Sequence, residues 1–136
     1  MTRWTCPACG RTFGRFGQGH LCAPVRTLND FLIAQPAELR GVFEAVVEQM
    51  SQLEDVIIEP GDAYLMLKRS RKFAALTARR RWVRMWLILP YAVHDDRIQS
   101  RTGATDHGIA HYVQLREAGD VDDTVRGWLM ESYEAF

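Results

Sequence analysis

Residues 63–89 show three apolar runs that are separated by two clusters of positive charge. In the last run, Val83 and Met85 alternate with Arg84 and Trp86. Because successive side chains of a β-strand point to opposite faces, this period of two predicts strands with one wholly apolar face and one mixed face. We therefore expect residues 63–89 to form a three-stranded antiparallel meander.

Two segments with helical periodicity flank the meander, one on each side. Their apolar side chains recur at intervals of three and four residues, which places them on one stripe of a helix. The stripes consist of Leu39, Val42, Phe43, Val46, Val47, Met50 and Leu53 in the first segment, and of Val121, Val125, Trp128, Leu129, Tyr133 and Phe136 in the second. We expect both helices to cover the apolar face of the meander, with Asp120 capping the second helix.

Shorter elements are expected between these segments. Residues 27–33 have the composition of a short helix, which should end before Pro36 because the residue before a proline avoids the α region. Residues 56–59 are a candidate edge strand. Residues 90–108 read as a polar connection and residues 109–116 as a last strand.

Charge is distributed unevenly along a chain whose net charge is zero. Residues 1–26 contain four arginines and no acid, and residues 60–101 contain ten Lys or Arg against three Asp. Residues 27–59 and 102–136, which include the two expected helices, each contain seven acidic residues. The basic N-terminal segment and meander could present a positive face to an anionic partner. Alternatively, their charges could be neutralised within the fold by the acidic helices.

The cysteines of the chain all lie in the first 22 residues, together with one histidine. Cys6 and Cys9 form a CPxCG knuckle, and His20 and Cys22 follow ten residues later. Four soft or borderline ligands at this spacing predict a closed tetrahedral zinc site, which leaves no open position for a catalytic water. Because so short a segment buries little apolar surface, we expect it to need the metal in order to fold.

The mixed side of the meander and its turns combine cations with aromatic rings, as nucleic-acid surfaces do. The candidate residues are Lys68, Arg69, Arg71, Lys72, Arg79, Arg80, Arg81, Trp82, Arg84 and Trp86. Hairpin turns are also commonly charged for solubility alone, so the same pattern is compatible with an ordinary solvated face.

A third group of residues suggests chemistry of a different kind. His94, His107 and His111 lie with several aspartates in residues 94–111, and such groups can act as acids and bases. Their spacing fits no established motif. The chain contains no phosphate-binding loop motif and no nucleophile-elbow motif. The common nuclease core requires an Asp or Glu two residues before a lysine, and neither of the two lysines, Lys68 and Lys72, has one.

The chain resembles a bacterial family in several segments that cover nearly its whole length. These are WTCPACGRTF at 4–13, QGHLC at 18–22, RRRW at 79–82, WLILP at 86–90, HYVQLR at 111–116 and WLMESY at 128–133. The family is the domain-of-unknown-function family numbered fifty-six fifty-five, in the version with a zinc-finger-like N-terminus. The resemblance implies a meander sheet flanked by helices, and it carries over only the zinc ligands Cys6, Cys9, His20 and Cys22.

The sequence therefore predicts an α+β fold, in which an antiparallel meander of three to five strands is covered by two amphipathic helices. We expect a zinc-binding finger at residues 1–26 and a main domain at residues 27–136. The longest apolar run, residues 85–93, is too short to span a membrane, and no export signal is evident, so we expect a cytoplasmic protein.

Three functions follow from these features. The leading hypothesis is a non-enzymatic, zinc-stabilised protein that binds nucleic acid or another polyanion on its basic meander. The alternatives are a protein-interaction or assembly module, and a small enzyme that uses the histidines and aspartates of residues 94–111. The sequence leaves the oligomeric state open.

Overall fold

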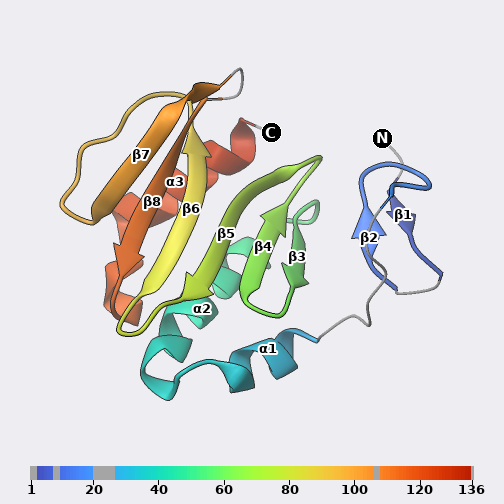
Figure 1. The fold of residues 1–136 in the computed structure, drawn as a ribbon, viewed down its shortest axis with the longest axis horizontal. Coiled ribbons are helices and arrows are strands. Elements are labelled where there is room, and N and C mark those ends of the chain that lie inside the picture. Colours follow the sequence, from blue (N-terminus) through green and yellow to red (C-terminus); the bar gives the residue numbers. More distant parts are fainter. Residues whose placement is uncertain (1–2, 8–9, 20–26, 106–107, 136) are drawn as a thin grey trace.

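The structure is a computed structural model that describes residues 3–7, 10–19, 27–105 and 108–135. In these residues three α-helices accompany two antiparallel sheets, one of two strands and one of six (Figure 1). The helices are α1 (Leu28–Ala34), α2 (Ala37–Met50) and α3 (Asp123–Glu134). The small sheet contains β1 (Trp4–Thr5) and β2 (Thr12–Phe13). The large sheet contains β3 (Ile57–Pro60), β4 (Tyr64–Lys68), β5 (Lys72–Ala78), β6 (Val83–Leu89), β7 (Ile98–Thr105) and β8 (Gly108–Leu115).

The predicted α+β class and the three-stranded meander are confirmed, and β3 is the expected edge strand. The prediction of three to five strands is wrong, because the sheet has six in the order β3-β4-β5-β6-β8-β7. The strand that sequence reasoning missed is β7, which lies in the expected polar connection. Within the described residues it is an edge strand paired with β8, through a register with two irregularities. An edge strand of this kind does not need a regular alternation of apolar residues, so the pattern gave no signal.

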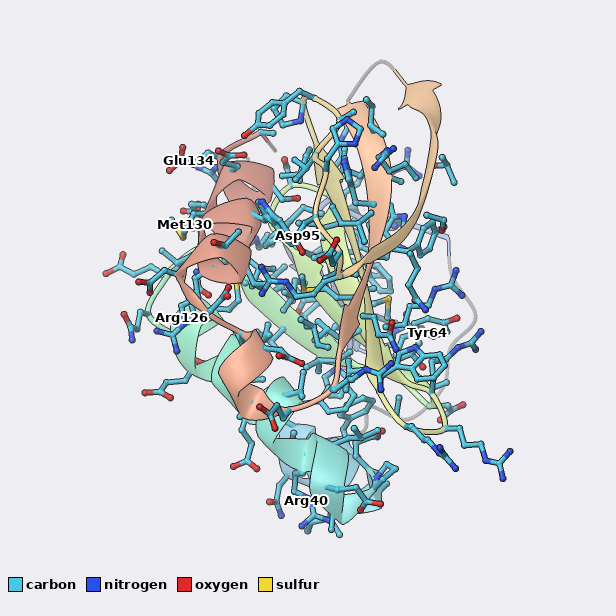
Figure 2. The ribbon with its side chains drawn as sticks, turned by 90° about the vertical axis from the view of Figure 1, so that its left-hand side faces the viewer. Arg40, Tyr64, Asp95, Arg126, Met130 and Glu134 are labelled. Carbon is cyan, nitrogen blue, oxygen red and sulfur yellow. The ribbon has the colours of Figure 1, made fainter. Side chains whose placement is uncertain are left out.

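Helices α2 and α3 pack on one face of the six-stranded sheet, as the two stripes predict. Figure 2 shows this arrangement from the side, with Arg126, Met130 and Glu134 on the helix side and Tyr64 on the opposite side. The core between these layers includes Phe31, Leu39, Val42, Phe43, Val46, Met50, Leu65, Leu67, Leu76, Val83, Met85, Leu87, Leu89, Val113, Leu115, Val125 and Leu129. None of the described helices is both long enough and apolar enough to cross a membrane.

The start of α3 differs from the expectation that Asp120 caps it. Asp122 is the N-cap residue, and its side chain accepts a hydrogen bond from the backbone N–H of Val125 at 3.0 Å. Asp120 instead closes a short 3₁₀ turn, Ala118–Asp120, where its carboxylate accepts from the N–H of Arg116 at 2.8 Å. Two aspartates near a helix start can both cap a turn, so the sequence did not distinguish them.

The small sheet lies beside β3, at one edge of the large sheet (Figure 1). Arg11 donates from Nε to the Glu59 carboxylate at 2.9 Å, and Lys68 forms an ion pair with the other oxygen of the same carboxylate. Phe13 is buried, with the cationic ends of Arg11 and Lys68 at 5.3 and 5.5 Å from its ring centre. One buried carboxylate on β3 therefore joins the N-terminal segment to the sheet.

The environment of Glu59 determines its ionisation. Its burial favours the neutral acid, but hydrogen bonds and charge from Lys68 and Arg11 outweigh that effect and lower the pKa of Glu59 below its ordinary value. The carboxylate is therefore ionised over the neutral range, where it holds both cations.

Candidate functional site

The face of the six-stranded sheet that points away from α2 and α3 is called the open face here. Strand pairing brings its side chains into rows that run across the strands. One row, called the Ala75 row, joins Met66 of β4, Ala75 of β5, Trp86 of β6 and Tyr112 of β8. The next row joins Tyr64, Thr77, Arg84 and Gln114 in the same strand order.

Cationic groups lie over two rings of the open face. The Lys72 ammonium is 5.1 Å from the ring centre of Trp86, and the Arg84 guanidinium is 4.3 Å from that of Tyr112. At such distances the attraction between the cation and the ring quadrupole is favourable. The open face therefore presents rings and cations as paired units, and a guanidinium plane on a ring is itself a surface on which a base can stack.

A depression of about 630 Å³ lies on the open face, between the β3–β4 turn and the Ala75 row. Its lining includes the rings of Tyr64, Trp86 and Tyr112, together with Met66 of β4 and Ala75 of β5. The volume is within the range of roughly 300 to 1,000 Å³ that is typical of small-molecule sites.

Two donor groups near this face have no protein acceptor within the described part of the chain. They are the indole Nε1 of Trp82 and the guanidinium Nε of Arg84, and both atoms are buried. A buried donor without an acceptor is costly, so such groups are usually satisfied by water or by a ligand. Water or a hydrogen-bond acceptor on a ligand would satisfy these donors.

The basic residues that the sequence singled out separate into two groups. Lys68 pairs with Glu59, while Arg69 donates to the Asp55 carboxylate at 2.8 Å and to the Tyr133 carbonyl at 3.1 Å. Both of these cations hold parts of the fold together. Lys72 and Arg71 are exposed at the start of β5, and the three arginines of the β5–β6 turn, Arg79, Arg80 and Arg81, are exposed at its other end.

Most of the predicted zinc site cannot be placed, since Cys9, His20 and Cys22 lie outside the described residues. Cys6 is described, and it is buried. Its N–H donates to the Arg11 carbonyl at 2.8 Å, and its carbonyl accepts from the N–H of Gly10 at 2.7 Å. Gly10 has a φ of 76°, a conformation that favours glycine. This tight turn is compatible with a metal-binding knuckle.

The rest of the described chain offers no alternative metal site. Among residues 3–7, 10–19, 27–105 and 108–135, no group of three or more His, Cys, Asp or Glu side chains is arranged to hold a metal ion. Because three of the four predicted ligands lie outside these ranges, this result does not test the CPxCG site, which stays a prediction.

The two histidines of residues 94–111 that the structure describes, His94 and His111, differ in their surroundings. His111 is fully buried on the helix side of β8, where Nε2 accepts from the Val93 N–H at 3.0 Å and Nδ1 lies 2.8 Å from the Ile109 carbonyl. Burial lowers the pKa of His111, so the ring is held neutral by its surroundings. His94 is exposed, and His107 lies outside the described residues.

Sequence reasoning did not single out Tyr112, Tyr64, Met66 and Ala75 as candidate binding residues. The available signal was strand parity, since the alternation within β8 already places Tyr112 opposite to His111. Parity alone could not show that β8 lies next to β6, because β7 comes between them in the sequence.

Comparison with known proteins identifies the family of the chain but not a relative of established activity. Neither the curated proteins nor the solved structures gave a match to this chain. One family model matches, described as "Domain of unknown function (DUF5655)", and it covers residues 29–135, which include every strand of the large sheet, helices α2 and α3, and all of α1 except its first residue. The chain therefore belongs to the DUF5655 family.

Proposed function

We propose that this protein is a non-enzymatic binding protein that holds single-stranded nucleic acid on the open face of its sheet. The observation that carries the proposal is the pair Trp86 and Tyr112, which are register partners on the sheet face opposite to α2 and α3 and which each have a cation over the ring. Proteins that bind single strands combine aromatic rings, on which bases stack, with cations that neutralise phosphates.

The distribution of charge supports a polyanion on this face. The exposed arginines of the β5–β6 turn extend the cationic surface beyond Arg84, while the two covering helices are acidic in sequence. A strand that approaches the open face is attracted, and one that approaches the helices is repelled. Lys68 and Arg69 are left out of the proposed contact surface, because their charges are already paired within the fold.

We also propose that zinc, bound by Cys6, Cys9, His20 and Cys22, holds the N-terminal segment in shape beside β3. The support is the chemistry of the four donors and the tight turn at Cys6. One equivalent of zinc by elemental analysis of the purified chain is expected. Its removal by a chelator should lower the thermal unfolding temperature, and a zinc-free protein that unfolds at the same temperature would reject this part of the proposal.

Fluorescence anisotropy of a labelled single strand over a range of salt concentrations tests the nucleic-acid proposal. Replacing Arg79, Arg80 and Arg81 together by Ala should weaken binding and reduce the slope of log affinity against log salt by about 2, since each phosphate contact on a single strand contributes roughly 0.7. Arg126→Ala is the matched control, because Arg126 is an exposed arginine on α3, on the opposite side of the sheet (Figure 2).

The outcomes separate the proposed function from its alternatives. The control should bind like wild type, and equal binding by wild type and the triple variant at low salt would reject the proposal. A chain that binds no single strand but forms salt-sensitive dimers in sedimentation would instead support the assembly module.

A further inference from the structure

The Ala75 row contains one small side chain between large ones, and this gives the open face its depression. Met66 and Trp86 are the register partners of Ala75 on its two sides, so its methyl group lies between a long side chain and a large ring. Ala75 is only 6% exposed although none of the described helices covers this face. The neighbouring side chains therefore form the walls, and Ala75 forms the floor.

The walls have the chemistry that recognises a flat aromatic group. Tyr64 and Trp86 offer rings on two sides of the floor, and Tyr64 is 52% exposed, so it can change rotamer when a ligand enters. The lining is mainly apolar, as expected of a site that removes a ring from water.

The polar groups at the rim would orient a bound nucleotide. Lys72 lines one part of the depression, and Asp62 lines another, on the β3–β4 turn. An ammonium group attracts a phosphate, whereas a carboxylate repels a phosphate and accepts hydrogen bonds from exocyclic amino groups. A nucleotide would thus place its phosphate towards Lys72 and its base edge towards Asp62.

We propose that this depression receives one unpaired nucleobase of a bound single strand, stacked against Trp86 over the Ala75 floor. The inference rests on the proposed function and adds to it a defined base site. In a duplex the faces of the bases are stacked on one another and cannot enter a depression of this kind. The protein should therefore prefer a single strand to a duplex of the same sequence.

The test compares a labelled single strand of about ten nucleotides, a length typical of such sites, with an abasic strand of equal length and charge. Wild type should bind the strand with bases about tenfold more tightly, within the range that one stacked base produces. Ala75→Leu fills the floor and should remove this preference by weakening binding of the strand that carries bases.

Ala110→Leu is the matched control, since Ala110 is another nearly buried alanine on the open face, where it pairs with Ile88 and does not line the depression. It should keep the preference for bases. Thermal unfolding of both variants checks that the fold is retained. The comparison of the two strands on wild type needs no variant, so it decides the question even where Ala75→Leu does not fold.

Each other result has a distinct meaning. If wild type binds both strands equally, and its affinity still falls with rising salt, the base site would be overturned and polyanion binding would remain. Failure to bind either strand would overturn both proposals. Equal affinity for the single strand and the duplex would show that the depression does not receive a base of the strand. Displacement of the strand by adenosine monophosphate at equal nucleotide concentration would also overturn this occupant, and it would assign the depression to a free nucleotide.

Discussion

The two faces of the six-stranded sheet are made by the same strands, yet they differ in almost every physical property. Along β6, Val83, Met85, Leu87 and Leu89 are fully buried under the helices, whereas the residues between them are half-buried on the open face. In β6 the covered face is wholly apolar, whereas the open face of the sheet mixes rings, cations and small side chains. The comparison teaches that the residues that form the core and the residues that we propose to bind a ligand alternate along one strand.

Truncation on the covered face should produce the largest effect. Leu87→Ala leaves a cavity between sheet and helices and should lower the free energy of unfolding by about 2 to 5 kcal/mol. Ile88→Ala, one residue further on the open face, should cost about 1 kcal/mol or less. Chemical denaturation of both variants measures the difference, and similar losses would show that the open face is packed as a second core.

A smaller effect is expected where the N-terminal segment meets β3. Glu59→Gln removes the charge that holds Arg11 and Lys68, and it should weaken this docking by about 1 kcal/mol, because the carboxylate is buried but both cations are partly exposed to solvent. Hydrogen exchange of residues 10–19 should then become faster. Glu44→Gln, an exposed acid on α2, is the control and should change nothing.

The same contact should depend on pH in a defined direction. Because the pKa of Glu59 is lowered in the fold, its contribution is complete above its ordinary value of 4.5 and is lost as the pH falls through the lowered pKa. Docking that persists unchanged in acid would contradict the assigned role of Glu59.

The smallest expected difference between the two faces concerns the neighbours His111 and Tyr112, and it is a difference in how stability depends on pH. His111 points to the covered face, and its lowered pKa means that the unfolded chain takes up a proton at about pH 6.5 while the folded chain resists it. Its contribution to stability is therefore complete above pH 6.5 and declines as the pH falls below that value. Arg101 and His94, which also disfavour the charged ring, reinforce the effect.

Denaturation from pH 8 to pH 5 measures this dependence. His111→Gln should flatten the curve, whatever its effect at pH 8, because the titrating group is gone. Tyr112→Leu, on the open face, should leave the pH dependence as in wild type. An equal slope in wild type and His111→Gln would show that other groups cause it.

Much of the main domain could be predicted because its signals are local. The alternation in β6 and the stripes of α2 and α3 each follow from the geometry of one element. β7 could not be predicted, since residues such as Ser100 and Arg101 on an irregular edge strand show no regular alternation. The ion pairs of Lys68 and Arg69 within the fold could not be predicted either. Their partners, Glu59 and Asp55, come close to them only when the chain folds.

By itself, the sequence determined which residues form the meander, which faces of its strands are apolar and which two helices cover them, because periodicity follows from backbone geometry. Only the tertiary structure decided that β8 inserts between β6 and β7, which brings Tyr112 beside Trp86 and leaves Ala75 as the floor of a depression. The reason is physical: strand order depends on how distant segments pair, and no local pattern in the chain encodes that choice.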